Sequence, residues 1–275
     1  MDLTAGAGPP TGGVSGPAGA GSSTGPPGPP VVAVVGPTAT GKSALGIALA
    51  HALGGEVVNA DSMQLYRGMD LGTAKLPPAE RGGLPHHLLD LWDVTVTASV
   101  AEYQLAARAV VDRLRAAGVV PILVGGSGLY VRAVLDRMEF PGTDPAARHA
   151  LAEELGALGA PALHARLAGL DPAAAAAILP TDGRRIVRAL EVVGLTGSVR
   201  ATLPARLDPV FPAAWIGLDV ATDALDARID RRVERMWADG LLDEVRALAR
   251  QGLRAGRTAS RALGYAQALR HLDGS

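Results

Sequence analysis

A glycine-rich segment near the N-terminus constrains the fold more than any other feature of the sequence. Residues 36–43 read Gly36-Pro37-Thr38-Ala39-Thr40-Gly41-Lys42-Ser43, the pattern G-x-x-x-x-G-K-[ST]. The segment follows the β-branched run 31–35 and opens a helical pattern that extends from Gly41 to about Leu53. Its glycines allow backbone N–H groups to surround phosphate oxygens, and the helix N-terminus adds partial positive charge. The segment therefore predicts a diphosphate site, whether or not the ligand is ATP, with Lys42 on the outer phosphate and Ser43 offering a hydroxyl to Mg²⁺.

Short apolar runs alternate with helical patterns along much of the chain. Strands are expected at 31–35, Glu56–Asn59, Pro121–Val124 and Ala214–Val220, and helices at Val100–Ala117 and from about Ala224 to Gln251. This order predicts an α/β fold: a P-loop NTPase-like, doubly wound parallel sheet that binds ligands at the carboxyl ends of its strands.

The composition divides the chain into four parts. Residues 1–29 are almost entirely Gly, Pro, Ala, Ser and Thr and predict a disordered tail, and they lack the pattern of a secretory signal. Residues 30–142 and 209–275 form the two parts of the core. Between them, residues 143–208 predict a helical insertion subdomain with helices at Pro145–Leu158, Pro161–Leu170, Pro172–Ile178 and Gly183–Leu195.

Composition and charge exclude several classes of protein. The sequence has no cysteine, which removes disulfides and thiolate chemistry, and no apolar run approaches the ~18 residues of a membrane span. We expect a cytoplasmic monomer with no membrane partner. Residues 228–275 carry ten basic and six acidic side chains, a net charge of +4. The two lysines, Lys42 and Lys75, stand among 24 arginines, which hints that each position needs a compact ammonium group.

Further polar residues follow the predicted strands. Asp61 comes directly after the second strand and could act as a general base, order a magnesium-bound water, or simply close a turn. The glycine-rich turn at 125–128 ends the next strand and places the Ser127 hydroxyl there. Two arginine groups suit phosphate binding, although helix surfaces also carry arginine for solubility. They comprise Arg184, Arg185 and Arg188 in the insertion, and Arg228, Arg232 and Arg235 at helical spacing on one face.

Taken together, seven segments resemble the tRNA dimethylallyltransferases (tRNA isopentenyltransferases). They are GPTATGKS at 36–43, NADSMQLYRGMDLGTAK at 59–75, LPHHLLD at 84–90, PILVGGSGLYVRAV at 121–134, DGRRIVRALEVVGLTG at 182–197, RIDRRVERMWADGLLDEVRAL at 228–248 and RALGYAQAL at 261–269. The resemblance runs in order over nearly the whole chain from about Val31 to Leu272. It implies transfer of a dimethylallyl group from dimethylallyl diphosphate to N6 of the adenine 3′ of a tRNA anticodon, with Mg²⁺ as cofactor.

The resemblance also implies roles for individual residues. Asp61 would be the base, Ser62, Met63 and Gln64 would hold the flipped-out adenine, and Ser127 would lie near the scissile bond. Residues 36–43 would bind the diphosphate, Ser43 through Mg²⁺, and Arg232, with Arg228 as second choice, would close the site. Contacts with the anticodon stem-loop would come from Asp61, Ser127, Arg148, Arg184, Arg185, Ile186, Val187, Arg188, and from Arg261, Ala262, Leu263, Gly264, Tyr265 and Ala266.

The sequence departs from this family at several places, including the extra residues 1–29 and Ala266, where the family often has a basic residue, and other interpretations stay open. Ser127 replaces a threonine, and the basic, aromatic C-terminal portion usual in the family is expected to be missing after Ser275. A small-molecule P-loop kinase would share the fold, but it predicts an acidic residue where Pro121–Val124 is followed by glycines and serine. Relatives that prenylate AMP or ADP would not use an RNA-binding insertion. A truncated tRNA-binding remnant without activity would keep every motif.

Overall fold

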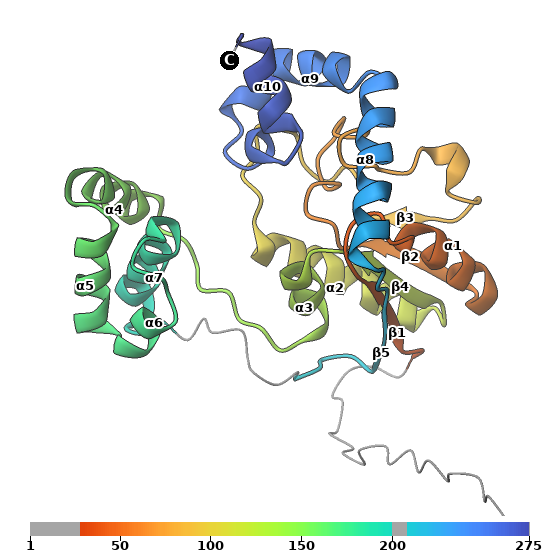
Figure 1. Ribbon diagram of the computed structural model, residues 1–275. Helices are drawn as coiled ribbons and strands as arrows, with labels where there is room; N and C mark the ends of the chain where they lie inside the picture. Colours follow the sequence, from red (N-terminus) through yellow and green to blue (C-terminus); the bar gives the residue numbers. More distant parts are fainter. Residues whose placement is uncertain (1–27, 200–207, 275) are drawn as a thin grey trace, which may run out of the picture.

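The computed structural model describes residues 28–199 and 208–274, and its centre is a parallel β-sheet (Figure 1). The strands are β1 (Val31–Val35), β2 (Gly55–Asn59), β3 (His86–His87), β4 (Val120–Gly125) and β5 (Ala213–Gly217). Their order in the sheet is β3-β2-β4-β1-β5, and every neighbouring pair is parallel. The predicted α/β class with a parallel sheet is confirmed.

Helices cover both faces of the sheet, as its short apolar strands require. Val32 and Val34 of β1 pack with α1 (Lys42–Leu53) on one face. Val31 and Ala33 point to the other face, which is covered by α2 (Val100–Ala116) and α3 (Gly128–Leu135). Helix α1 approaches closely, because a Cβ on Gly46 would lie 2.6 Å from Cγ2 of Val124.

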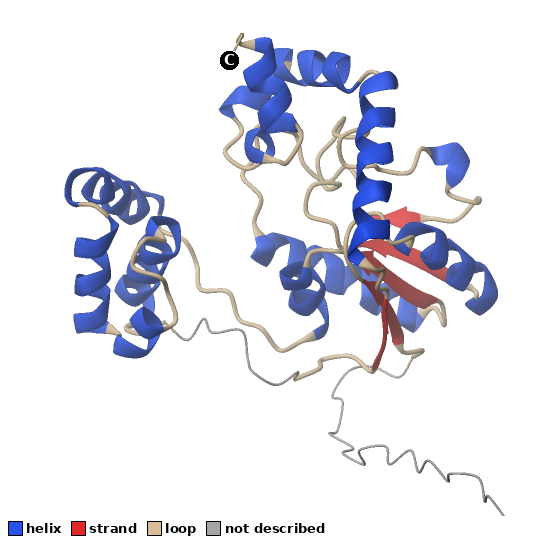
Figure 2. Cartoon of the chain, in the orientation of Figure 1, coloured by secondary structure: helices blue, strands red, loops and turns tan. Residues whose placement is uncertain are grey.

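The insertion is entirely helical in its described part and lies apart from the sheet (Figures 1 and 2). It consists of α4 (Pro145–Leu158), α5 (Ala160–Leu170), α6 (Pro172–Ala176) and α7 (Gly183–Thr196), which confirms the predicted helices. A separate apolar core holds it together, including Leu151, Leu163, Leu167 and Ile186. The carboxylates of Asp144, Asp171 and Asp182 cap α4, α6 and α7 by accepting hydrogen bonds from backbone N–H groups.

A buried carboxylate, Glu191 on α7, ties this insertion together. It accepts hydrogen bonds from the guanidinium groups of Arg148 and Arg188 and from the backbone N–H of Asp144. Arg188 also donates to the carbonyls of Pro141 and Gly142, in the segment that leads into the insertion. Burial alone would raise the pKa of Glu191, but the bonds from Arg188 and Arg148 outweigh it and hold the pKa below its ordinary value of 4.5.

The C-terminal part corrects one prediction. The sequence suggests one helix from about Ala224 to Gln251, but the structure has α8 (Thr222–Ala238) and α9 (Leu241–Arg250). Gly240 separates them at φ 98°, a left-handed conformation that an ordinary helix residue avoids. The break turns α9 back against α10 (Tyr265–Leu272), and Tyr265 of α10 is buried in the main core.

Several short elements carry no clear sequence signal. These are α3, β3, α10 and the 3₁₀ turns Pro78–Glu80, Leu253–Ala255 and Ala259–Arg261. The tail expected at 1–29 lies outside the described residues except for its end, where Arg115 donates to the carbonyls of Gly28 and Pro29. The described residues contain no helix long and apolar enough to cross a membrane.

Removing the Glu191 carboxylate tests the cohesion of the insertion. Glu191→Ala is expected to cost about 2 kcal/mol of unfolding free energy, because two half-buried arginines and one N–H lose their acceptor. Hydrogen exchange in α4 and α7 measures the effect. Since the folded pKa is depressed, this stabilisation is present above pH 4.5 and is lost as pH falls through the folded pKa.

Glu153→Ala is the matched control, because Glu153 lies on α4 with its side chain 71% exposed and 3.6 Å from His149. Its effect should stay within about 0.5 kcal/mol. Equal losses in the two variants would contradict a special role for Glu191.

Candidate active site

Three strands end side by side and place the predicted functional segments together. In the sheet, Val35 of β1 lies beside Gly125 of β4, and Val124 of β4 lies beside Asn59 of β2. The segments that follow are therefore neighbours: residues 36–43 after β1, Ser127 after β4 and Asp61 after β2. The carboxyl ends of parallel strands are where such sheets bind ligands.

The loop at 36–43 has the backbone shape of a phosphate cradle. Ala39 and Gly41 have positive φ angles of 60° and 97°, and α1 begins directly after them with no acidic residue in its first turn. Thr40 is buried, and its hydroxyl donates to the carbonyl of Pro37. Gly36 leaves no room for a side chain, because a Cβ there would lie 2.4 Å from the carbonyl oxygen of Leu218. The loop thus presents backbone N–H groups and a helix N-terminus to an anion.

Three cationic side chains surround this loop. The Lys42 ammonium lies 2.5 Å from the carbonyl of Pro37. From α8, Arg232 donates to the Thr38 hydroxyl at 3.1 Å and Arg228 approaches the Ala39 carbonyl at 3.5 Å. Burial lowers the pKa of Lys42, with the charge of Arg232 adding to it and that of Asp61 opposing it. Arg228 and Arg232 thus lie beside the loop, and the cluster favours a multiply charged anion.

Asp61 is held by the end of β2. The Asn59 side chain accepts from the backbone N–H of Asp61 at 3.0 Å and donates to its carbonyl at 3.1 Å. The Tyr103 hydroxyl in turn donates to the carbonyl of Asn59. One carboxylate oxygen, Oδ1, accepts a bond from the N–H of Met63 at 2.9 Å. The backbone of Asp61 is thus fixed from both sides, which gives its carboxylate a defined position.

Ser127 lies opposite the residue that follows Asp61. The hydroxyls of Ser62 and Ser127 are 3.3 Å apart, and the N–H of Ser62 points to the Ser127 hydroxyl at 3.5 Å. Glycine precedes this contact for a steric reason, because a Cβ on Gly125 would lie 2.4 Å from the carbonyl carbon and oxygen of Ala60. The close approach of the two chains brings Asp61 and Ser127 to one site.

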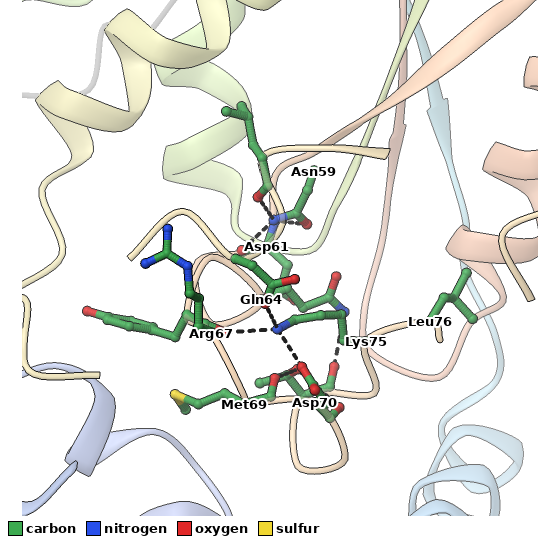
Figure 3. A network of polar contacts seen from close by, with 12 residues as sticks. Asn59, Asp61, Gln64, Arg67, Met69, Asp70, Lys75 and Leu76 are labelled. Carbon is green, nitrogen blue, oxygen red and sulfur yellow. Dashed lines mark hydrogen bonds and ion pairs between the residues drawn. The ribbon is translucent and has the colours of Figure 1, made fainter. Parts of the chain in front are cut away.

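Gln64 is held by the loop at 70–76 (Figure 3). Its side-chain Nε2 donates to the carbonyls of Thr73 at 3.0 Å and Ala74 at 3.4 Å. A small hollow beside the site is lined by Ser43, Asn59, Gln64 and His86 together with apolar residues. One hydroxyl, two amides and one imidazole thus contribute polar groups to a small hollow beside the first turn of α1.

The structure separates the predicted RNA-contacting residues into three places (Figure 1). Asp61, Ser62, Met63, Gln64 and Ser127 lie at the strand ends. Arg148, Arg184, Arg185, Ile186, Val187 and Arg188 lie on α4 and α7 of the insertion, and Arg261, Ala262, Leu263, Gly264 and Tyr265 precede or begin α10. Their contacts with RNA stay predictions.

Several of these side chains have partners inside the protein. Ile186 and Val187 are buried in the core of the insertion, and Ala262 and Tyr265 are buried in the main core. Arg148 and Arg188 are bound to Glu191. The exposed candidates for RNA contact are therefore chiefly Arg184, Arg185, Arg261 and Leu263. The sequence pattern could not tell which of these side chains face outward.

Sequence reasoning assigned no role to Asn59 and Tyr103, which fix Asp61, or to Glu244, which supports the loop at 70–72. Asn59 stands inside the 59–75 segment, so its position carried a weak signal. Glu244 and Tyr103 are distant in sequence, and only folding brings them near the site.

A glycine-rich loop between a strand and a helix, with the Asp61 carboxylate after β2, two strands away in the sheet, is typical of parallel α/β enzymes that handle phosphorylated substrates. The family model described as "IPP transferase" matches residues 64–275. The tRNA dimethylallyltransferase of Streptomyces coelicolor is 67% identical over 253 residues, which cover 92% of this chain and 81% of that protein. The tRNA dimethylallyltransferase of Salinispora arenicola is 67% identical over 240 residues, which cover 87% of this chain and 70% of that protein.

Solved structures agree with these relatives. The full-length tRNA isopentenylpyrophosphate transferase from Bacillus halodurans superposes with a TM-score of 0.62 at 42% identity, covering 89% of this chain and 78% of its own. A eukaryotic dimethylallyltransferase acting on tRNA gives 0.70 at 27% identity, over 80% of this chain and 56% of its own. The chain belongs to the IPP transferase family and is a prenyltransferase.

Gly125→Ala tests the packing of the strand ends. The added Cβ would overlap the Ala60 backbone, so the variant should lose about 1–3 kcal/mol of stability and displace Asp61. Thermal unfolding and prenyl-transfer rates measure the two effects. Gly128→Ala is the control, because a Cβ there meets nothing within 4 Å and the position opens α3. A Gly125→Ala variant as stable and active as the control would contradict the packing argument.

Proposed function

We propose that the protein transfers a dimethylallyl group from dimethylallyl diphosphate to N6 of the adenine next to the 3′ side of a tRNA anticodon. The observation that carries the proposal is that Asp61, the Ser127 turn and the cationic loop at 36–43 follow three strands that end side by side, with Ser127 in contact with Ser62, the residue after Asp61. A base and a diphosphate cradle at one strand edge suit a reaction in which a nucleophile loses a proton and diphosphate departs. The family membership supports the same reaction.

The proton and the leaving group have separate places in this site. The exocyclic amine attacks the allylic carbon, so that an N–C bond forms and the carbon–oxygen bond to diphosphate breaks. Asp61 takes the amine proton, because an exocyclic amine of adenine is a poor nucleophile without a base. The electron pair of the broken bond stays on the diphosphate oxygen, where Lys42, Arg232 and the loop N–H groups stabilise the added charge.

The residues around the loop also fit Mg²⁺. The cation prefers oxygen ligands, keeps several waters and is commonly held by one or two protein groups together with substrate phosphates. The Ser43 hydroxyl is in place for this on the first turn of α1, and the described residues contain no cluster of three or more His, Asp or Glu that would form an all-protein site. When bound, Mg²⁺ supplies neutralisation of diphosphate charge.

A small-molecule kinase is the alternative that shares the loop. Strand β4 ends at Gly125 and is followed by Gly126 and Ser127, in place of the acidic residue that the kinase interpretation expects. The helical insertion with its exposed Arg184 and Arg185 has no use in a kinase of small molecules but suits an RNA stem. We also propose tRNA as the acceptor, with the protein acting as a cytoplasmic monomer as expected from the sequence.

Asp61→Asn tests the proposed base. Asparagine keeps an oxygen for the Met63 N–H but cannot take a proton, so transfer of labelled dimethylallyl to unmodified tRNA should fall about 10²–10⁴-fold. Affinity for tRNA and the unfolding temperature should stay unchanged. An Asp61→Asn variant with full activity, or phosphate transfer from ATP by the wild-type protein, would contradict the proposal.

Arg184→Ala tests the RNA contact of the insertion. Loss of one phosphate contact should weaken tRNA binding and reduce the slope of log K against log salt by about one unit. Arg166→Ala removes the same charge from the insertion, where Arg166 pairs with Glu154, and serves as the control. Equal salt slopes for the Arg184→Ala variant and the wild type would refute the contact.

A further inference from the structure

A carboxylate from the C-terminal part supports the loop that carries Gln64's partners. Glu244 of α9 accepts hydrogen bonds from the backbone N–H groups of Asp70, Leu71 and Gly72, at 3.2, 2.7 and 3.4 Å. The Tyr265 hydroxyl donates to the same carboxylate at 2.5 Å. Three successive N–H groups converging on one anion form a cradle that only a charged acceptor satisfies fully.

A buried lysine fixes the other side of this loop (Figure 3). The side chain of Lys75 is only 2% exposed, and its ammonium donates to Asp70 and Asp90 at 2.6 Å each and to the carbonyl of Tyr66 at 2.8 Å. Three donors meet three acceptors, which matches the geometry of an ammonium and not the planar fork of arginine. The second lysine of the sequence therefore joins both ends of the segment 66–75 and the neighbouring Asp90.

These contacts together determine the position of Gln64. Its Nε2 is bound to Thr73 and Ala74, the two residues between the Glu244 cradle and Lys75. In the described residues, the side-chain bonds of Gln64 are made by Nε2. Its Oε1 is therefore the atom available to accept a hydrogen bond from a ligand beside the hollow that Gln64 lines. Movement of the loop would move that acceptor.

We propose that Glu244 and Lys75 are positioning residues that set the acceptor of Gln64 for the adenine amine, with Tyr265 aligning Glu244. This inference rests on the proposed tRNA prenylation. Through these residues, α9 and α10, which lie outside the strand ends, are coupled to Gln64 and to the hollow that it lines. The diphosphate loop at 36–43 makes none of these contacts, so we expect the coupling to act on the use of tRNA and not on the binding of dimethylallyl diphosphate.

Glu244→Gln provides the direct test, because it keeps the size of the side chain but turns an amide NH₂ toward groups that are themselves donors. The value of kcat/KM for tRNA should fall about tenfold, while KM for dimethylallyl diphosphate stays unchanged. Tyr265→Phe removes one of the four bonds and should cause a fall of about threefold. The Lys75→Arg variant should be as impaired as the Lys75→Met variant, because the guanidinium fork does not fit the three acceptors.

A double-mutant cycle separates positioning from general loss of structure. Glu244→Gln should have no further effect on kcat/KM in a Gln64→Ala background if it acts through Gln64. Fold-changes in kcat/KM that multiply in the double variant would overturn the proposal. Asp243→Asn, at a neighbouring exposed carboxylate of α9 that pairs with Arg246, should behave as wild type. If Glu244→Gln fails to fold, the cycle is run with Tyr265→Phe.

The outcomes distinguish this inference from the proposed function. An active wild type whose Glu244→Gln variant keeps its kcat/KM for tRNA would overturn the positioning role alone. A wild type that transfers no dimethylallyl group would overturn the proposed function, and the same cycle is then measured as the Kd for an anticodon stem-loop carrying the adenine. Additive changes in Kd would overturn the positioning role as well.

Discussion

The parallel register of β1, β4 and β2 is the constraint on which the site depends. Their carboxyl ends reach the same edge, so the loop at 36–43, the turn at Ser127 and the carboxylate of Asp61 become neighbours although they are far apart in sequence. The register requires close contact of backbones, and Gly125 provides it against Ala60. A side chain there would separate the groups whose proximity defines the chemistry.

The site contrasts with its surroundings in charge. Lys42, Arg228 and Arg232 converge on the loop from two helices, and burial lowers the pKa values of Lys42 and Arg232 because their charged forms lose water. A bound diphosphate would compensate these positive charges, and the departing diphosphate, which gains negative charge as the bond breaks, would compensate them further. Charges are also paired in the insertion, where the buried Glu191 binds Arg148 and Arg188. The sequence alone assigned both arginines to RNA contact.

Patterns local in sequence were predicted well, and those that depend on distant partners were not. The strand and helix around residues 36–43 follow from the apolar run and the glycine-rich motif, and the four helices of the insertion from Ala-rich segments punctuated by Pro and Gly. The single long helix at 224–251 was wrong because Gly240 takes a left-handed conformation that composition did not reveal. The burial of Ile186 and Tyr265 depends on packing against other helices, which an amphipathic motif does not specify.

The sequence by itself determined that the chain contains a glycine-rich loop between a strand and a helix, a parallel α/β core and a helical insertion, since these depend on short-range periodicity and on glycine conformation. It also marked Asp61, Ser127 and Arg232 as candidates. Only the tertiary structure decided that Arg232 reaches Thr38, that Asn59 and Tyr103 fix Asp61, and that Glu244 holds the loop above Gln64. Hydrogen bonds between residues up to 194 positions apart form only when the sheet and the C-terminal helices pack, so no local pattern encodes them.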